Sequence, residues 1–396
     1  MVKTCRRFET GIGHPNKVGR MNILVLNAGS SSLKFELFAV TPESIDTNSE
    51  RILAKGEAER AASMGEALES IFRQIGSTVV EAVGHRVVHG GERFHESVII
   101  DAEVEKQIEE LSILAPLHNP HNLEGYRAAR AHLPGVPQVA AFDTAFHHTL
   151  PLRAYVYGLP YEYLTEKKIR RYGFHGISHR YVSWRFAHLH GKKRADYRMI
   201  TCHLGNGCSV CAIDQGRSID TSMGFTPLEG LIMGTRSGDV DAGAVLHLIT
   251  QEREDPAMLL HVLNGASGLK GISGISNDMR DLLREEGAGN ERAALAIEAF
   301  CYRIRKYVGM YLAAMNGADA LIFTGGIGEN AAVIRARICE DLGNLGIAVD
   351  SEANARDSKD AREVGNSKIP VWVVPTDEEL LIARDTLRCI LKIPHE

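Results

Sequence analysis

The stretch NILVLNAGSSSLKF at residues 22–35 constrains the fold more than any other part of the chain. Its four consecutive apolar residues are typical of a buried strand, and Gly29 lets the backbone turn tightly enough to direct N–H groups at an anion. The serine hydroxyls add donors, Lys34 adds a positive charge, and Asn27 offers a side-chain oxygen to Mg²⁺ or its waters. The stretch indicates a phosphate-binding hairpin, for which a polar hairpin turn without a ligand is the alternative.

The second half of the chain repeats this design. Residues 199–210 read MITCHLGNGCSV, again an apolar strand, a glycine-rich turn and a returning strand. Residues 320–330 read ALIFTGGIGEN, a strand that leads into a glycine-rich loop and a helix. Two hairpins that face each other would hold the phosphates of a nucleotide, and the third segment is suited to its sugar and base.

Four charged or titratable residues lie in or next to apolar or glycine-rich segments, where the free-energy cost of burying them must be offset. Arg86 lies inside an apolar strand, which is unfavourable unless an anionic substrate or a carboxylate meets it, and a buried salt bridge is as good a reading as a substrate contact. Asp143 follows an apolar strand, where α/β proteins place ligand sites, although a helix N-cap also uses Asp. His175 lies between two glycines, and Arg236 lies in a glycine-rich loop. A lone histidine is more often structural, so His175 alone is a weak signal.

Periodicity and turn residues predict the main elements. We expect helices at residues 66–75, 104–114, 123–132, 291–315 and 380–391, and strands at residues 136–142, 320–324 and 372–374. At 396 residues the chain exceeds one compact core, so two domains are expected.

Composition narrows the class of partner. The net charge of −5 and the spread of the basic residues do not favour a nucleic-acid or membrane surface, and no apolar run reaches the length of a membrane span. The seven cysteines are an odd number in a large chain, which favours reduced thiols and a cytoplasmic protein. Cys208 and Cys211 have metal-like spacing, but without a second pair they are better read as ordinary strand cysteines.

Residues 1–20 are basic and lack periodicity, whereas Met21 opens directly onto the first strand. We expect residues 1–20 to be a disordered extension or the product of a misassigned start, with Met21 as the native start. The chain contains neither a Walker A sequence nor the catalytic loop of protein kinases, which excludes the two most common ATP-binding classes.

Seven motifs in order resemble those of the acetokinase (acetate kinase) family, in the superfamily of sugar kinases, actin and heat-shock chaperone ATPases. They are NAGSSSLK at 27–34, HRVVHGG at 85–91, FDTAFH at 142–147, GFHG at 173–176, HLGNG at 203–207, MGTR at 233–236 and GIGEN at 326–330. The resemblance implies an α/β protein with two actin-like, ribonuclease H-like domains, each with a βββαβαβα core, an interdomain cleft and a homodimer. It also implies domain limits: residues 21–145, completed by the helix at 380–396, and a nucleotide-binding domain at residues 146–379.

The same resemblance implies roles for individual residues. Arg86 and Arg236 correspond to the arginines that hold the acetate carboxylate and the transferring phosphoryl group, His175 to the transition-state stabiliser, and Asp143 to an essential aspartate. The implied pocket for the substrate methyl group comprises Val88, Leu117, Phe174 and Pro227. The implied ATP-binding residues are Lys34, His203, Leu204, Gly205, Asn206, Gly207, Asp278, Met279, Arg280, Gly326, Ile327, Gly328, Glu329 and Asn330. The implied ligands of Mg²⁺ (or Mn²⁺) are Asn27 and Glu378.

Elementary chemistry agrees with this set. A carboxylate substrate is already an anion at neutral pH and needs no general base, but it must approach a polyphosphate, so positive charge is required. We therefore expect direct in-line transfer from ATP to acetate, giving acetyl phosphate and ADP, with Asp143 organising magnesium through water. The alternatives are a propionate or other short-chain acyl kinase, and a non-catalytic actin-like nucleotide switch, which would need neither Arg86 nor Arg236.

Overall fold

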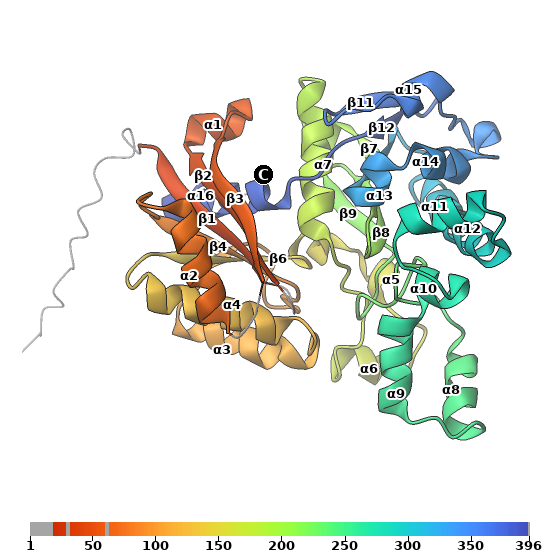
Figure 1. Cartoon of the computed structure of the whole chain (residues 1–396), viewed down its shortest axis with the longest axis horizontal. Coiled ribbons are helices and arrows are strands. Elements are labelled where there is room, and N and C mark those ends of the chain that lie inside the picture. Colours follow the sequence, from red (N-terminus) through yellow and green to blue (C-terminus); the bar gives the residue numbers. More distant parts are fainter. Residues whose placement is uncertain (1–18, 29–31, 60–62, 395–396) are drawn as a thin grey trace, which may run out of the picture.

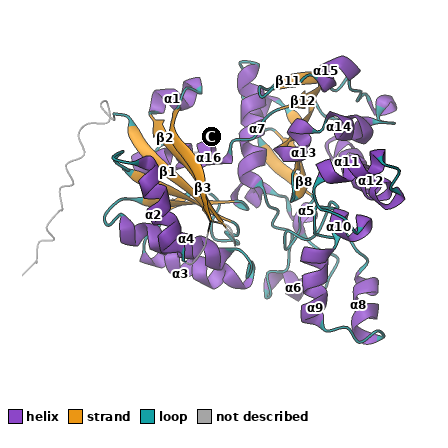
Figure 2. Ribbon diagram, in the orientation of Figure 1, coloured by secondary structure: helices purple, strands orange, loops and turns teal. Residues whose placement is uncertain are grey.

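The computed structural model describes residues 19–28, 32–59 and 63–394 of the chain. The expected turn at residues 29–31 and most of the expected extension at residues 1–20 therefore lie outside the described residues. Two six-stranded sheets stand side by side, and each is covered by helices (Figures 1 and 2).

The first sheet has the order β3-β2-β1-β4-β6-β5. Strands β1 to β3 pair antiparallel, β1, β4 and β6 pair parallel, and the short β5 pairs antiparallel with β6. The strands are β1 (Met21–Ala28), β2 (Ser32–Val40), β3 (Arg51–Glu59), β4 (Ala82–Val87), β5 (Val98–Ile99) and β6 (Gln138–Phe142).

The second sheet repeats this topology. Read from β9, its order is β9-β8-β7-β10-β12-β11, with three antiparallel strands, then the parallel set β7, β10 and β12, then an antiparallel edge strand. The strands are β7 (Arg198–Leu204), β8 (Cys208–Asp214), β9 (Arg217–Thr221), β10 (Ala320–Thr324), β11 (Arg362–Gly365) and β12 (Val371–Val373). The predicted duplication is confirmed, and the edge strands β5 and β11 are an addition that the predicted core did not contain.

Strand β1 shows why the apolar run of the opening hairpin is central. Leu24 and Leu26 point to one face and pack in the cluster that includes residues of α2, whereas Ile23 and Val25 point to the other face. Since alternate residues of a strand face opposite sides, a continuous apolar run is what a strand covered on both faces requires. All four side chains are at most 1% exposed.

Most helices lie on the outer sides of the sheets (Figure 2). In the first half of the chain they are α1 (Pro42–Thr47), α2 (Met64–Ile75), α3 (Ala102–Glu110) and α4 (Asn119–His132). In the second half they are α5 (Leu152–Tyr155), α6 (Tyr161–Thr165), α7 (Gly176–Leu189), α8 (Ala242–Thr250), α9 (Pro256–His261), α10 (Gly268–Ser273), α11 (Met279–Gly287), α12 (Glu291–Met315), α13 (Gly325–Asn330), α14 (Ala332–Cys339), α15 (Ser351–Ala355) and α16 (Glu378–Leu391).

Helices α7 and α16 join the two halves. The last helix, α16, packs against β1, β4 and β6 of the first sheet and also against α7, which in turn packs against β7 of the second sheet. One apolar cluster therefore contains Val25 from β1, Val182 from α7, Ile322 from β10 and Leu387 from α16. The two sheets thus share a core on one side of the molecule (Figure 1).

The expected elements agree closely with the observed ones. The expected helix at residues 291–315 has the bounds of α12, and the expected strand at 320–324 has those of β10. The helix expected at 104–114 ends earlier as an α-helix, because a short 3₁₀ turn at Leu111–Ile113 follows α3. The strand expected at 136–142 begins at Gln138, and that expected at 372–374 is shifted by one residue.

Candidate functional site

A cavity of about 280 Å³ lies where the first sheet faces loops of the second half of the chain. It contains all four residues expected to be catalytic and all four expected to hold a methyl group. Its lining residues are Asn27, Ala28, Arg86, Val88, Leu117, His118, His121, Asn122, Asp143, Phe174, His175, Gly207, Pro227 and Arg236. These eight expected positions, which come from separate segments of the chain, therefore meet in one place.

Arg86 is held in this cavity by carboxylates. Its Nε and Nη2 donate to the two carboxylate oxygens of Asp143 at 3.0 and 2.7 Å, and Nε lies 3.8 Å from Oε2 of Glu378. Burial alone would lower the pKa of Arg86, but the two carboxylates raise it above its ordinary value. Arg86 thus forms the expected salt bridge, with its own side chain 22% exposed and that of Asp143 2% exposed, whereas its contact with a substrate stays a prediction. Asp143 pairs with Arg86 and does not cap a helix, because Thr144 occupies the N-cap position of the following 3₁₀ turn.

Arg236 differs from Arg86 in having no carboxylate contact within the described part of the chain. Its Nη1 makes a long hydrogen bond of 3.3 Å to the carbonyl oxygen of Pro227 and lies 3.9 Å from the sulfur of Met233. Burial lowers the pKa of Arg236, and the positive charge of Arg86 acts in the same direction. The cavity therefore holds a guanidinium group whose charge the protein leaves uncompensated.

His175 occupies the N-cap position of α7 in the left-handed backbone conformation, with φ of 57°. The next residue, Gly176, donates its N–H to the carbonyl oxygen of Asp143, which joins the two loops that carry Asp143 and His175. Burial, followed by the nearby His203 and Arg86, holds the pKa of His175 well below 6.5, so its ring is neutral at physiological pH. The ring stacks on that of His203, with centroids 4.3 Å apart.

The oxygen atoms of Asn27 and Glu378 flank Arg86. Oδ1 of Asn27 accepts from Nη1 of Arg86 at 3.3 Å, and its Nδ2 donates to Glu379 at 3.3 Å, so Glu379 fixes which way the amide points. Burial raises the pKa of Glu378, and the carboxylates of Asp143 and Glu379 act in the same direction. An amide oxygen beside a carboxylate that is crowded by other carboxylates is a suitable donor set for a hard divalent cation, whose charge would favour the ionised form that binds it.

A metal at this place would need further ligands. The described residues contain no group of three or more His, Cys, Asp or Glu side chains arranged to hold a metal ion. A cation held by Asn27 and Glu378 would complete its shell with waters and phosphate oxygens, as Mg²⁺ commonly does.

A second cavity, of about 550 Å³, brings together most of the residues expected to bind ATP. Its lining residues are Gly205, Asn206, Asn277, Asp278, Met279, Arg280, Leu283, Gly326, Ile327, Asn330 and Ala331. The apolar side chains of Met279, Leu283 and Ile327 offer a surface for a flat ring. The glycines at 205 and 326 leave the backbone open to a close approach.

Some residues expected in the nucleotide site have other contacts. Glu329 directs its carboxylate to backbone N–H groups, accepting from Gly325 at 2.9 Å and from Thr376 at 3.0 Å, and so ties the glycine-rich loop to the segment that precedes α16. Asp278 is the N-cap of α11 and pairs with Arg280, whose hydrogen bonds lower the pKa of Asp278 to about 2.

Five other expected nucleotide residues do not line the second cavity. Lys34 is exposed on β2 opposite Asn27, and His203 and Leu204 lie at the end of β7. Gly328 lies inside α13, and its carbonyl oxygen accepts a hydrogen bond from the buried Arg335. Gly207 lies in the first cavity.

Several residues of the first cavity were missed by sequence reasoning. Asn122 accepts from the backbone N–H of Val88 at 3.1 Å and donates to the carbonyl oxygen of Ala28 at 3.0 Å, so it connects β1 and β4 at the cavity. His118 lines the cavity with a pKa lowered to about 4, mainly by burial and then by Arg236. The proline-flanked loop that carries His118 was a signal for it, whereas nothing in the sequence singled out Asn122.

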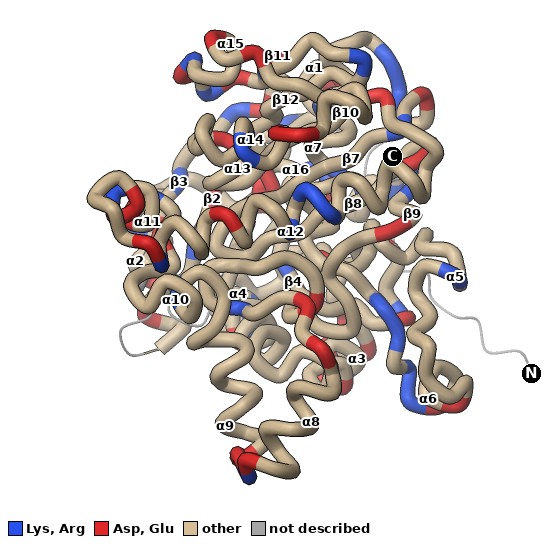
Figure 3. The backbone as a smooth tube through the Cα atoms, turned by 90° about the vertical axis from the view of Figure 1, so that its right-hand side faces the viewer, with Lys and Arg blue, Asp and Glu red and all other residues tan. Residues whose placement is uncertain are grey.

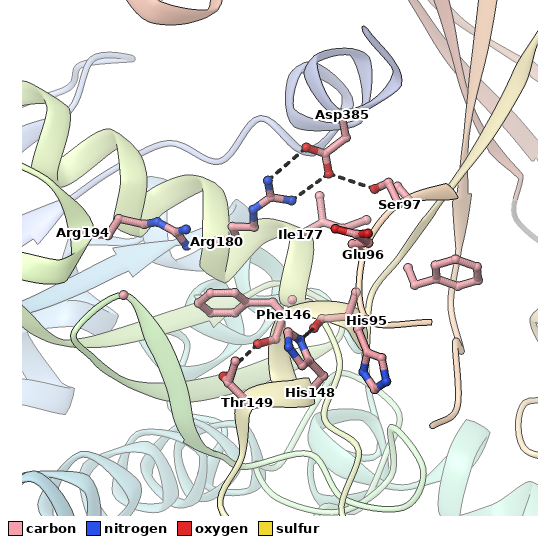
Figure 4. A pocket seen from close by; sticks show the side chains of 15 residues that line it. His95, Glu96, Ser97, Phe146, His148, Thr149, Ile177, Arg180, Arg194 and Asp385 are labelled. Carbon is pink, nitrogen blue, oxygen red and sulfur yellow. Dashed lines mark hydrogen bonds and ion pairs between the residues drawn. The ribbon is translucent and has the colours of Figure 1, made fainter. Parts of the chain in front are cut away.

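A third cavity, of about 210 Å³, is lined by residues on either side of Asp143 but by none of the expected site residues (Figure 4). Within it Arg180 of α7 and Asp385 of α16 form an ion pair at 2.7 Å, and Ser97 donates to Asp385 at 2.9 Å. These contacts hold α7, α16 and the segment before β5 together next to the Arg86–Asp143 pair.

A charged cavity between two duplicated sheets, next to a larger cavity lined by glycines and apolar side chains, defines the class of two-domain α/β kinases. Within that class, the model of the acetokinase family matches residues 22–384, and the chain belongs to this family. The resemblance drawn from the seven motifs is thereby confirmed.

Individual relatives agree with this assignment. The chain is 49% identical to the acetate kinase of Halothermothrix orenii, over 93% of this chain and all of that protein. It is 48% identical to the acetate kinase of Thermotoga maritima, over 94% of this chain and all of that protein.

Two solved structures are also similar. The acetate kinase of Porphyromonas gingivalis has a TM-score of 0.86 at 42% identity, covering 93% of this chain and 100% of that one. A propionate kinase of Francisella tularensis has a TM-score of 0.84 at 40% identity, covering 93% of this chain and 99% of that one.

Proposed function

We propose that this kinase phosphorylates acetate with ATP, reversibly, to give acetyl phosphate and ADP. The observation that carries the proposal is Arg236, a guanidinium group in the cavity without a carboxylate contact among the described residues. A buried guanidinium group without a carboxylate partner favours binding of an anion, and a cavity of about 280 Å³ admits a small carboxylate and a phosphoryl group.

The reaction needs charge cancellation rather than proton transfer. Acetate is ionised at neutral pH, so one carboxylate oxygen attacks the γ-phosphorus directly while the bond to the β,γ-bridging oxygen breaks and ADP leaves with the electron pair. Arg236 contacts the developing charge on the equatorial oxygens. Arg86, held by Asp143, grips the acetate carboxylate in a fork geometry that lysine cannot reproduce. His175 is neutral and stabilises the phosphoryl group by hydrogen bonding rather than by charge.

Mg²⁺ (or Mn²⁺) is the proposed metal, held by Asn27 and Glu378, and it would neutralise charge on the β- and γ-phosphates when bound. Asp143 acts on this site indirectly. It accepts two hydrogen bonds from the Arg86 guanidinium group, which itself lies beside Oδ1 of Asn27 and Oε2 of Glu378.

ATP is proposed to place its base and sugar in the second cavity and its phosphates along the segment from His203 to Gly207. Support comes from Gly207, which lines the first cavity, and Gly205, which lines the second, so the segment leads from one to the other. For Glu329 we propose a supporting role, since its carboxylate already accepts two backbone hydrogen bonds.

Acetate is proposed over propionate on the basis of the apolar wall. Val88 and Phe174 are 7% and 1% exposed, Pro227 lines the same cavity, and Leu117 is 59% exposed. One additional methylene changes the binding free energy in such a pocket by only about 1–3 kcal/mol, so propionate is expected as a weaker substrate. The similarity to a propionate kinase makes propionate kinase activity the second candidate.

The two activities and the nucleotide switch can be separated in one assay. The protein is incubated with Mg-ATP and acetate, propionate or butyrate, while acyl phosphate is trapped as the hydroxamate and ADP release is followed. We expect the highest kcat/KM for acetate. The highest value for propionate would assign the second candidate, and ADP release without trapped product from any acid would leave only a nucleotide switch.

A homodimer is the proposed assembly, formed through helices α8 and α9. No residue of α8 is buried, yet its sequence is apolar, and Leu246, Met258 and Leu260 of the two helices are 58%, 61% and 56% exposed. Charged residues lie at the tip between the two helices rather than along them (Figure 3). Light scattering after gel filtration should give about twice the chain mass of 43.4 kDa, and a Leu246→Glu, Met258→Glu variant should give a monomer.

The remaining proposals concern organisation and location. We propose domain limits of 21–145 with the C-terminal helix, and 146–379, supported by the packing of α16 on the first sheet. No helix in the described residues is both long and apolar enough to cross a membrane. A cytoplasmic location is proposed from the use of ATP and from Cys202, Cys208, Cys211, Cys301 and Cys339, which are free thiols within the described residues.

A further inference from the structure

His175 is connected to a chain of buried polar side chains that leads away from the cavity. Its Nδ1 lies 2.9 Å from Oγ of Ser209, the same Oγ lies 2.8 Å from Nε2 of His179, and Nδ1 of His179 lies 2.7 Å from Oγ1 of Thr201. Ser209, His179 and Thr201 are completely buried. The proposed reaction requires none of these three residues to touch a substrate.

The opposite edge of the His175 ring faces the cavity. A Cβ atom built on Gly207 would lie 3.3 Å from both Cε1 and Nε2 of His175, and 3.5 Å from Nη1 of Arg236. Within the described residues, Nε2 of His175 has no hydrogen-bond partner. It is not one of the fully buried polar atoms that lack a partner, so this nitrogen is partly exposed. This nitrogen therefore opens onto the space beside Arg236.

We propose that Ser209, His179 and Thr201 are positioning residues that fix His175 as the neutral tautomer with its proton on Nε2. In this form His175 donates a hydrogen bond to the anion held by Arg236. The inference rests on the proposed function for the identity of that anion, which is the transferring phosphoryl group. The direction of the hydrogen bonds along Thr201, His179, Ser209 and His175 follows from the protein alone.

Counting the hydrogen-bond donors and acceptors of these side chains gives the direction of the hydrogen bonds. If Thr201 donates to Nδ1 of His179, then His179 donates through Nε2 to Ser209, Ser209 donates to Nδ1 of His175, and the remaining proton of His175 is on Nε2. Each of the three donors inside the chain then has an acceptor, and the Nε2–H of His175 is left to donate into the cavity.

The reverse arrangement leaves the Thr201 hydroxyl as a donor, and the described residues offer it no acceptor. An unsatisfied buried donor costs roughly 1–3 kcal/mol, which favours the first direction. The reverse arrangement would also point a lone pair of His175 at an anion.

The neighbouring His203 is held in a similar way. Its Nδ1 lies 2.8 Å from Oγ of Ser178, which in turn lies 2.8 Å from Oγ1 of Thr376. Burial lowers the pKa of His203 to about 4, so the stacked pair of His203 and His175 is uncharged. Two neutral rings can stack closely, whereas two imidazolium ions at this distance would repel each other.

The test is a nitrogen NMR measurement on ligand-free enzyme labelled with ¹⁵N-histidine, in which long-range couplings report which ring nitrogen carries the proton. The His175 signal is assigned by its loss in His175→Gln. We expect the Nε2-protonated pattern between pH 6 and 9. A pattern with the proton on Nδ1, or a charged ring at pH 7, would overturn the proposal, and this readout does not depend on activity.

Variants supply the functional half of the test. Ser209→Ala should produce a mixture of tautomers and lower kcat about five- to tenfold, with KM for acetate and ATP changed less than about twofold, since one net hydrogen bond is lost. Ser209→Thr retains the hydroxyl and should restore both signals.

The matched control is Ser183→Ala, which removes an equally buried serine hydroxyl on α7 that bonds only to the carbonyl oxygen of Arg180. It should leave the His175 spectrum and kcat unchanged. An unchanged tautomer in Ser209→Ala would overturn the role of Ser209. Failure to trap acyl phosphate in wild-type enzyme would instead count against the proposed function. The NMR spectrum of His175 would then still decide whether the proposed tautomer is correct.

Discussion

Replacing either of the two cavity arginines should abolish most of the activity, but the two replacements should differ in their effect on the free energy of unfolding. Arg86 compensates Asp143, which is 1% exposed, and lies 3.8 Å from Glu378. Arg86→Ala leaves these carboxylates in the cavity without their cation, and breaking a buried pair in this way typically costs about 3–5 kcal/mol.

Arg236→Ala removes a charge that no carboxylate among the described residues contacts. Its contacts are one long hydrogen bond to Pro227 and a contact with the sulfur of Met233, and burial lowers its pKa. We therefore expect the unfolding free energy of ligand-free Arg236→Ala to lie within about 1 kcal/mol of the wild-type value, or above it. For both variants, kcat should fall at least about a hundredfold, the scale of losing one preorganised donor of positive charge.

Inorganic phosphate offers a second readout. An anion that binds the folded enzyme through Arg236 stabilises it by about 1.4 kcal/mol at ten times its Kd, and this gain should disappear in Arg236→Ala. Urea unfolding with and without phosphate, together with hydroxamate trapping, measures all three quantities. Turnover of Arg236→Ala within about threefold of wild type, or a loss of stability equal to that of Arg86→Ala, would refute the reasoning.

Three further predictions concern the wider site. In Gly176→Ala, the new Cβ would lie 2.2 Å from the carbonyl oxygen of Asp143, so overpacking should cost about 1–3 kcal/mol and lower kcat at least about tenfold. Gly309→Ala, at a helix position with nothing within 4 Å, should keep full activity and show that alanine as such is harmless. Val88→Ala should shift the ratio of kcat/KM for propionate over acetate upward by about tenfold, and an unchanged ratio would remove Val88 from the methyl pocket. Finally, thermal melting should show the protein losing stability as the pH falls from 6.5 toward 4. Burial lowers the pKa of several histidines to about 4, so unfolding takes up protons in this window, at up to about 1.4 kcal/mol per pH unit for each residue. The histidines with this value are His85, His89, His118, His147 and His203. The raised pKa values of Glu36, Asp377 and Glu378, about 7, about 6 and about 7, act in the opposite direction, but these three groups are fewer than the five histidines. A melting temperature that is constant between pH 6.5 and 5 would contradict this prediction.

Much of the fold could be predicted because local and global signals agree. The apolar run in β1 demanded a strand covered on both faces, and the recurrence of its pattern at β7 predicted the duplication that the two sheet orders confirm. The bounds of α12 followed from its periodicity and its asparagine cap. The edge strands β5 and β11 could not be predicted, since two to four residues carry too little pattern and pair only because a neighbouring strand offers an edge.

The residues of the site can likewise be divided into those that the sequence predicted and those that it could not. Arg86, Asp143, His175 and Arg236 stood out because a charged or titratable residue inside an apolar or glycine-rich segment needs a reason, and the structure brings them together. Ser209 did not stand out, because a serine in a strand is common and its contacts with His175 and His179 depend on chain segments about thirty residues away. Glu329 was placed in the nucleotide site by its motif, while its hydrogen bonds with backbone N–H groups appear only in three dimensions.

The central claim is that the phosphoryl group passes directly from ATP to the carboxylate, with the protein supplying charge and position but no covalent intermediate. The stereochemical course at phosphorus tests this most directly, using ATP made chiral at its γ-phosphorus with oxygen isotopes and acetate as acceptor. A single in-line displacement predicts inversion of configuration in the acetyl phosphate. Retention would require two displacements, and therefore a phosphorylated residue that this account does not contain.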